Sequence, residues 1–309
     1  MYAAKARGSN NFQFFTHEMN RISNERLQLE SAMRVALEQG GFSVAFQPKV
    51  DHRRQIVGAE ALARWHTADF GTVTPDRFIP IAEETTLIQE IGYWVMKTAC
   101  AQYSFWLNNG LAIPHLSVNV SARQFHTAGF VQQVEYVLRD TGVPPSRLLL
   151  EVTESVVLEN RLDSIAKIRQ LKALGVRMSI DDFGTGYSSL AYLKRFPVDQ
   201  LKIDRSFVRD LGVTPQSSAV VTAIIALARS LGLRVIAEGV ENLRQMEVLH
   251  RLGCGVMQGF LFSRPIPPHE LEDWLKQTVL PRKAPWIGKV GEADLSDALR
   301  PAAPRAKPA

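Results

Sequence analysis

Carboxylate, amide and ammonium side chains stand at the carboxyl ends of short apolar stretches that have the length of β-strands. In chain order they are Glu60, Asn119, Glu151, Asp181, Asp182, Lys202, Glu238 and Gln258. Burying a lone carboxylate is costly, so several carboxylates directed at one place require cations between them. Hard divalent ions with oxygen ligands, Mg²⁺ or Mn²⁺, suit this set, and the sequence has no His or Cys cluster that would call for zinc.

The adjacent pair Asp181 and Asp182 offers one carboxylate that can bridge two ions and one that can bind the second ion. Such an arrangement is typical of two-metal hydrolysis of phosphoesters. A loop with Gly184 and Gly186 follows, and glycines there let the backbone approach a ligand or metal closely. Glycine loops are common, so this loop alone carries little weight.

Each of these residues also has an ordinary structural explanation. Taken singly, each carboxylate is more typical of an ion pair at a strand end, whereas the set in one barrel mouth favours metal binding. Lys202 lies inside an apolar stretch and Asn119 lies between two valines, which favours a functional role for both. Arg64 by itself is typical of a surface ion-pair partner.

The elements that position these residues alternate between strand-like and helical patterns. The strand candidates are residues 43–47, 56–62, 116–120, 148–152, 176–180, 200–203, 235–237 and 256–258. From the second candidate onward each gap can hold a crossover helix, which predicts an α/β, TIM-type (β/α)₈ barrel with the strand ends gathered at one face. Residues 48–55 are too few for a crossover, so we expect the first strand to be antiparallel to the rest.

Bulk composition is that of one large soluble domain: 309 residues, 46% hydrophobic, with no apolar segment long enough to span a membrane. A net charge of +5 suits an anionic ligand but is more often a solvated surface, and we expect no binding to a DNA or RNA duplex. The two cysteines lack metal-ligand spacing, which favours a reducing compartment. Because the N-terminus has no secretory pattern, we expect a cytoplasmic location.

Together the polar positions resemble the EAL-domain phosphodiesterases, over roughly residues 29–275. The resemblance rests on seven motifs in family order: Glu60-Ala61-Leu62, Asn119-Val120-Ser121, Glu151-Val152-Thr153-Glu154, Asp181-Asp182-Phe183-Gly184-Thr185-Gly186, Leu201-Lys202-Ile203-Asp204, Ala237-Glu238-Gly239-Val240-Glu241 and Gln258-Gly259-Phe260. It implies hydrolysis of cyclic di-GMP to linear pGpG with two Mg²⁺ or Mn²⁺ ions per site, and inhibition by Ca²⁺. A catalytically silent cyclic di-GMP receptor is the alternative, although the intact motifs favour an enzyme. An unrelated metal-dependent barrel hydrolase or lyase would explain the carboxylates but not the motif order.

The resemblance also implies a role for each matching residue. It makes Glu60, Asn119, Glu151 and Asp181 ligands of the first ion, with Asp181 bridging and Asp182 holding the second. Lys202 resembles the lysine that orients the attacking water, and Glu238 the carboxylate that assists the metal or the water. The general base stays open between Lys202, Glu238 and metal-bound hydroxide. The remaining residues are similar to those that line or close the substrate site, Gln47, Arg64, Glu241 and Gln258, and to the glutamate that steadies the glycine loop, Glu154.

A second, shorter resemblance is to the C-terminal end of a GGDEF domain, at residues 1–15. It divides the chain into this remnant, an entry or linker helix over residues 16–41, the EAL barrel over residues 42–277 and a flexible Pro/Ala-rich tail over residues 278–309. It also implies fusion to an upstream GGDEF or sensory region, which in the parent protein can carry an attachment to the inner membrane. Family analogy further allows a homodimer through the segment after Asp182.

Overall fold

The computed structural model describes residues 17–279, with gaps at residues 112, 160, 186–194 and 214. The predicted GGDEF remnant, the tail beyond residue 279, Gly186 and most of the segment proposed for dimerisation lie outside the described residues. In the described part, no helix combines the length and the apolarity needed to cross a membrane.

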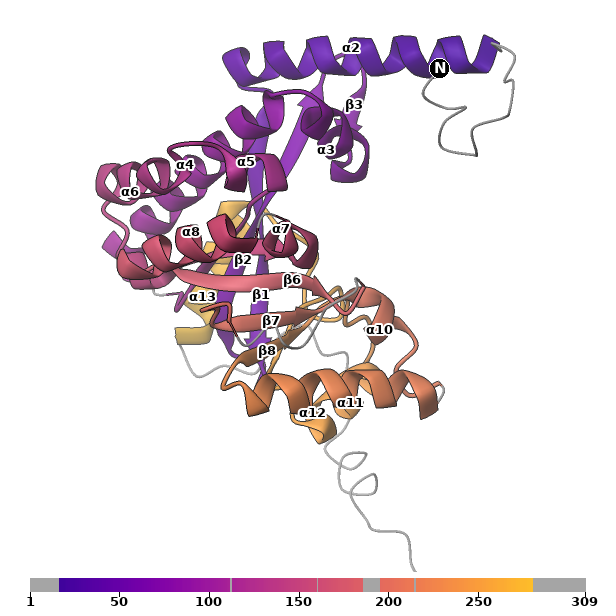
Figure 1. Ribbon diagram of the computed structural model, residues 1–309, viewed down its shortest axis with the longest axis vertical. Coiled ribbons are helices and arrows are strands. Elements are labelled where there is room, and N and C mark those ends of the chain that lie inside the picture. The colour runs from indigo at the N-terminus through magenta and orange to yellow at the C-terminus, as the bar shows by residue number, and fades with distance from the viewer. Residues whose placement is uncertain (1–16, 112, 160, 186–194, 214, 280–309) are drawn as a thin grey trace, which may run out of the picture.

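Eight strands close into a barrel, as the sequence predicts (Figure 1). They are β1 (Phe42–Asp51), β2 (Ile56–Thr67), β4 (Leu116–Asn119), β5 (Leu148–Thr153), β6 (Arg177–Phe183), β7 (Gln200–Ile203), β8 (Arg234–Ala237) and β9 (Val256–Met257). β1 pairs antiparallel with both β2 and β9, whereas β2 and β4 to β9 are parallel to one another. The prediction of one reversed strand is confirmed.

The β1–β2 hairpin is longer than the sequence pattern suggests. The Oδ1 atom of Asp51 accepts hydrogen bonds of 2.8 Å from the backbone N–H groups of Arg53 and Gln55, which closes the tight polar turn. Arg54 has a left-handed φ of 62° within this turn. A short strand, β3 (Gly71–Val73), pairs antiparallel with the far end of β2; it was not predicted because three residues show no alternation.

Helices surround the barrel. They are α2 (His17–Gln39), α3 (Pro75–Glu84), α4 (Leu87–Asn108), α5 (Ala122–His126), α6 (Phe130–Thr141), η1 (Pro145–Arg147), α7 (Glu154–Leu158), α8 (Arg161–Ala173), α10 (Arg205–Arg209), α11 (Pro215–Ser230), α12 (Leu243–Leu252) and α13 (Pro268–Val279). Part of the β6–β7 connection lies outside the described residues; every other parallel crossover contains a helix. α13 runs past the predicted domain end at residue 277.

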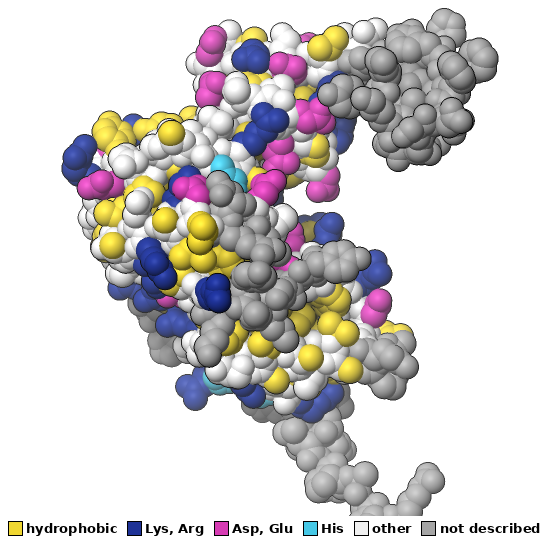
Figure 2. All heavy atoms as spheres, viewed as in Figure 1, with side chains coloured by type: hydrophobic (Ala, Val, Ile, Leu, Met, Phe, Trp, Pro, Cys, Tyr) yellow, Lys and Arg dark blue, Asp and Glu magenta, His cyan; other side chains and the backbone are white. Residues whose placement is uncertain are grey.

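The predicted entry helix is present as α2, which extends away from the barrel in Figure 1. Ion pairs connect it to α3: Arg26 with Glu84, and Glu25 with Arg77. Figure 2 accordingly shows acidic and basic side chains intermixed over these two helices. Exposed pairs of this kind stabilise a fold only slightly, so the buried residues of α2, such as Leu29 and Met33, hold it in place.

Apolar packing lies mainly between the sheet and the helices. Tyr103 and Trp106 are fully buried and Trp94 packs against the same core, so these aromatic residues serve packing. Trp106 also packs edge-on against Phe46, with ring centroids 4.7 Å apart. The inside of the barrel differs, because buried polar side chains point into it: Lys49, Ser117, Ser179, Gln200 and Lys202. Such groups require partners: Gln200 and Ser179 bond one another, whereas Lys49 and Lys202 bond carboxylates.

Candidate active site

A cavity of about 390 Å³ opens at the carboxyl ends of the barrel strands. Its lining contains most of the predicted site residues: Gln47, Glu60, Arg64, Asn119, Asp181, Lys202, Glu238, Glu241 and Gln258. Glu151, which is 1% exposed, is buried beside this set and bonded to Lys202. Strands far apart in the sequence meet here because parallel strands of a closed barrel end at the same face.

Glu60 is anchored on the long strand β2, opposite Gln47 on β1. Its carboxylate accepts hydrogen bonds from Asn119 Nδ2 at 2.6 Å and from Gln258 Nε2 at 2.8 Å. Burial alone would raise the pKa of Glu60, but Lys202, Lys49 and these two amide donors together lower it. Glu60 is therefore a charged, oriented ligand at neutral pH.

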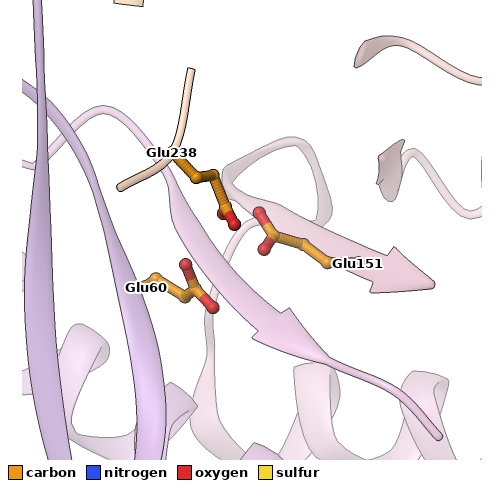
Figure 3. Close-up of side chains that lie close together, drawn as sticks. All are labelled: Glu60, Glu151 and Glu238. Atoms are coloured by element: carbon orange, nitrogen blue, oxygen red, sulfur yellow. The ribbon is translucent and has the colours of Figure 1, made fainter. Parts of the chain in front are cut away.

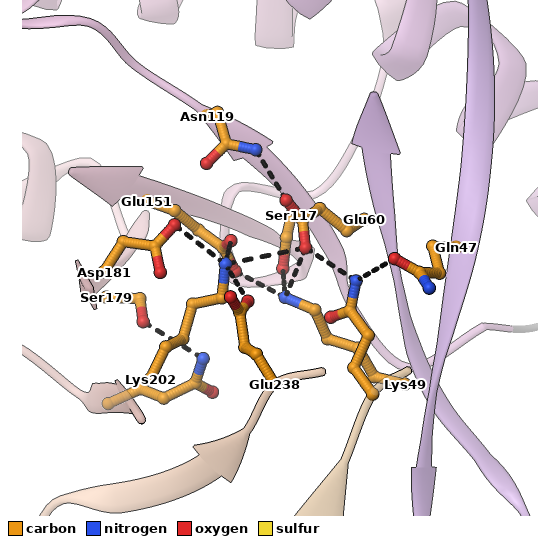
Figure 4. A network of polar contacts seen from close by, with 12 residues as sticks. Gln47, Lys49, Glu60, Ser117, Asn119, Glu151, Ser179, Asp181, Lys202 and Glu238 are labelled. Atoms are coloured by element: carbon orange, nitrogen blue, oxygen red, sulfur yellow. Dashed lines mark hydrogen bonds and ion pairs between the residues drawn. The ribbon is translucent and has the colours of Figure 1, made fainter. Parts of the chain in front are cut away.

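Lys202 lies at the centre of the carboxylates, with 1% of its surface exposed (Figure 4). Its Nζ atom is 2.5 Å from Glu151 Oε2, 2.9 Å from Asp181 Oδ2 and 3.5 Å from Glu60 Oε2, and it also pairs with Glu238. Burial would lower the pKa of Lys202, but the four carboxylates outweigh burial and hold it well above its ordinary value. The side chain stays protonated at neutral pH.

Glu238 follows β8 and completes a group of three carboxylates. Figure 3 shows Glu60, Glu151 and Glu238 pointing toward one another from three separate parts of the barrel. Burial and the neighbouring carboxylates raise the pKa of Glu238, against the opposing effect of Lys202. A divalent ion bound here would favour the charged form of Glu238.

Asp181 and Asp182 sit at the end of β6, where the register with β7 shifts. Asp182 adopts a left-handed φ of 52°, and its N–H donates to Asp181 Oδ1 at 2.8 Å. Burial, the charge of Asp181 and the charge of Asp204 raise the pKa of Asp182 to about 6. Among non-glycine residues, Asp is one of those that adopt this conformation most readily, so the sequence tolerates the sharp change of direction at the end of β6.

The start of the glycine loop is fixed from α7. Gly184 N–H donates to Glu154 Oε2 at 3.1 Å, at a left-handed φ of 99°. A Cβ atom on Gly184 would come within 3.0 Å of the Phe207 ring, so both conformation and space favour glycine. This places Glu154 where it can steady the loop, while Gly186 lies outside the described residues.

Two sets of carboxylate oxygens are close enough to bind a cation each. Glu60, Glu151 and Glu238 form one set, and Asp181, Asp182 and Glu238 form the other, with the ligand atoms of each set within 4.8 Å of one another. Glu238 is a member of both sets. The bridging role that the family resemblance implies for Asp181 stays a prediction. All-oxygen sets with this excess of negative charge fit Mg²⁺ or Mn²⁺.

Asn119 differs from a buried core residue, because it is exposed at the end of β4. Its Nδ2 atom donates to Glu60, which leaves the amide oxygen of Asn119 free to serve as a ligand.

The predicted substrate residues line the same cavity, next to Glu60. Gln258 Nε2 bonds both Gln47 Oε1 at 2.9 Å and Glu60 Oε2, and Gln47 Nε2 bonds Ser263 O at 2.9 Å. Gln258 therefore links Glu60 on β2 to Gln47 on β1. Arg64 is partly buried, its N–H donates to Ala63 O at 2.7 Å, and burial lowers its pKa.

Sequence reasoning missed two residues of this site. Lys49 bonds Glu151 from inside the barrel, and Asp204 bonds Asp182. Lys49 was missed because the predicted strand ended at residue 47, whereas β1 continues to Asp51 and directs Lys49 inward. The sequence did contain a signal for Lys49, because this lysine lies between Pro48 and Val50. A lysine among apolar residues is also what singled out Lys202.

Comparison with known proteins agrees with this architecture. The chain is 47% identical over 272 residues to the bifunctional diguanylate cyclase/cyclic di-GMP phosphodiesterase MucR of Pseudomonas aeruginosa, covering 88% of this chain and 40% of MucR. It is 39% identical over 277 residues to the cyclic di-GMP phosphodiesterase PdeR of Escherichia coli, covering 90% of this chain and 42% of PdeR. The chain thus spans about two fifths of the length of these relatives.

A solved structure described as the PaMucR phosphodiesterase in complex with c-di-GMP superposes with a TM-score of 0.77 at 47% identity, covering 79% of this chain and 99% of that one. The sequence model of the EAL domain matches residues 30–265, which include every residue that lines the cavity. Fold, site and sequence agree: the chain belongs to the EAL domain family.

Proposed function

We propose that this chain is a cyclic di-GMP phosphodiesterase that hydrolyses its substrate to linear pGpG with two divalent cations, Mg²⁺ or Mn²⁺. The observation that carries the proposal is the pair of carboxylate sets that share Glu238 at one cavity. The relatives support it, since two of them are named cyclic di-GMP phosphodiesterases and the PaMucR structure contains c-di-GMP.

When bound, the two ions would activate a water and stabilise charge on the phosphate. Glu60, Glu151 and Glu238 would hold one ion and Asp181, Asp182 and Glu238 the other, with Asn119 as an added oxygen ligand. Ca²⁺ should inhibit, because it prefers more ligands at longer distances than Mg²⁺ does.

Lys202 would orient the attacking water by donating a hydrogen bond. Its raised pKa keeps the ammonium protonated at neutral pH, so we assign it orientation and charge stabilisation rather than proton abstraction. Arg64 and Gln47 lie on the cavity wall beside Glu60 and would contact a substrate phosphate.

The decisive experiment is hydrolysis of cyclic di-GMP by the purified chain with Mg²⁺, Mn²⁺ or Ca²⁺, with Glu60→Gln as the paired variant. We expect pGpG with Mg²⁺ or Mn²⁺, none with Ca²⁺, and a rate at least a hundredfold lower for the variant. Tight binding without turnover in all three ions would instead make the chain a receptor. Neither binding nor turnover would reject both functions.

We further propose that the chain works in the cytoplasm within a longer signalling protein and forms a homodimer. The greater length of MucR and PdeR supports the longer signalling protein, because each contains sequence beyond the matched region. Sedimentation of the purified chain tests the second part: a mass of one subunit at all concentrations would contradict it.

A further inference from the structure

Lys49 is a second lysine buried within the barrel, with 3% of its surface exposed. It lies on the reversed strand β1, and Figure 4 shows its ammonium among the carboxylates together with that of Lys202. Its Nζ donates to Ser117 Oγ at 2.8 Å and to Glu151 Oε1, and lies 4.0 Å from Glu60 Oε2.

Glu151 is held between the two lysines. Lys49 bonds its Oε1 atom, and Lys202 bonds its Oε2 atom while also contacting Asp181 and Glu238. Oε2 therefore lies on the side of the other predicted metal ligands, and Oε1 is turned toward Ser117 and Lys49. Since Glu151 is almost completely buried, no water can replace a lost partner at little cost.

We propose that Lys49 is a positioning residue for metal binding. By fixing Oε1 of Glu151 it keeps the carboxylate in one orientation, with Oε2 presented to the cation shared with Glu60 and Glu238. Ser117 in turn fixes the ammonium of Lys49. This inference rests on the proposed function, because it assumes that the carboxylates bind divalent ions.

Electrostatic repulsion alone predicts the opposite change in metal affinity, so the direction of the measured change tests the proposal. Lys49 is a cation close to the metal ligands, so its charge alone repels a divalent ion, and its removal should strengthen ion binding. If positioning dominates, removing Lys49 should weaken ion binding, because Glu151 loses its fixed orientation. Partners that orient a metal ligand are commonly worth 10- to 100-fold in metal affinity.

The test measures the Mn²⁺ affinity of the full chain by calorimetry in the absence of substrate. The variants are Lys49→Met, which keeps the length of the side chain without its ammonium, Glu151→Gln, and the double variant. We expect Lys49→Met to lower Mn²⁺ affinity roughly tenfold or more, and the double variant to bind no more weakly than Glu151→Gln alone. That non-additivity would show that Lys49 acts through Glu151.

A matched control is Lys167→Met, which removes a mostly buried lysine bonded to Phe125 O at 2.8 Å on α8, away from the cavity. It should leave Mn²⁺ affinity unchanged. Unchanged or higher affinity in Lys49→Met, or a double variant whose losses simply add, would overturn the proposal. If Lys49→Met fails to fold, Ser117→Ala provides the second test, with a smaller loss of affinity expected and no loss contradicting the inference.

Turnover by the unaltered chain is measured in parallel. Normal Mn²⁺ binding without hydrolysis would reject the proposed enzyme and leave the role of Lys49 to be decided by the affinities. No Mn²⁺ binding by the unaltered chain would reject both.

Discussion

The two ends of the barrel carry charged side chains of opposite sign. The repulsion between like charges is relieved in a different way at each end. At the carboxyl ends of the strands, five buried or partly buried carboxylates surround Lys202 and Lys49. At the amino ends of the strands, three arginines gather around His115: Arg147, Arg177 and Arg234. Among the described residues no ion pair joins these three arginines to an acid.

Water access explains the difference. Arg234 is exposed and the other basic groups are partly exposed, so solvent screens their mutual repulsion. Within this group, His115 is the side chain that can lose its charge. Burial lowers its pKa most, and the nearby cations lower it further, to about 4; these are Arg177, Arg234, Arg147 and Lys49. Glu60 and Glu151 have no such access, and they remain next to one another only with ammonium groups or metal ions between them.

The largest expected effect is that of removing the central cation. Lys202→Met leaves four carboxylates without their common partner, and we expect a loss of about 3–5 kcal/mol in the free energy of unfolding without metal. Denaturant unfolding measures it. Arg177→Met, at the amino end, should cost less than about 1 kcal/mol. Equal losses of unfolding free energy in Lys202→Met and Arg177→Met would contradict the proposed difference between the two ends.

Divalent ions should stabilise the fold only through the carboxylates at the carboxyl end of the barrel. At a Mn²⁺ concentration about 100 times the dissociation constant, the free energy of unfolding should rise by about 2.7 kcal/mol. Asp181→Asn should remove most of this gain, whereas Arg177→Met should keep it. Thermal unfolding with and without EDTA provides the measurement, and an unchanged gain in Asp181→Asn would remove Asp181 from the metal site.

Acid should destabilise the amino end through His115. The unfolded chain takes up the proton below pH 6.5, whereas the folded chain does so only near pH 4, so stability falls as pH falls between these values. Because the ring is only half-buried, screening reduces the effect to about 1 kcal/mol. His115→Gln should lose this part of the pH dependence. Identical pH profiles for the two proteins would show that His115 does not contribute.

The smallest expected effect separates burial from charge at His115. Arg234→Gln removes an exposed cation, and we expect the pKa of His115 to rise by roughly half a unit, as measured by NMR titration. Lys167→Met, on α8, serves as the control with no expected shift. No change in Arg234→Gln would assign the lowered pKa to burial and to the other cations.

Local sequence patterns were sufficient for the barrel and for most of the candidate site. A gap too short for a crossover predicts that the first strand is reversed, and the polar residue that ends each apolar stretch predicts which side chains reach the cavity. Both inferences depend on neighbours in the chain, so no tertiary contact is needed to make them. The family motifs add the roles of these residues because their order repeats that of known members.

Only the tertiary structure decided how these residues are paired. Barrel closure sets which carboxylates lie within reach of one another, so Glu238 has oxygen atoms near Glu60 and Glu151 and also near Asp181 and Asp182. The left-handed backbone at Asp182 and its bond to Asp204 depend on the shifted register of β6 against β7. Lys49 enters the site because β1 continues past Gln47 and is held between β2 and β9, an arrangement that the local sequence does not encode.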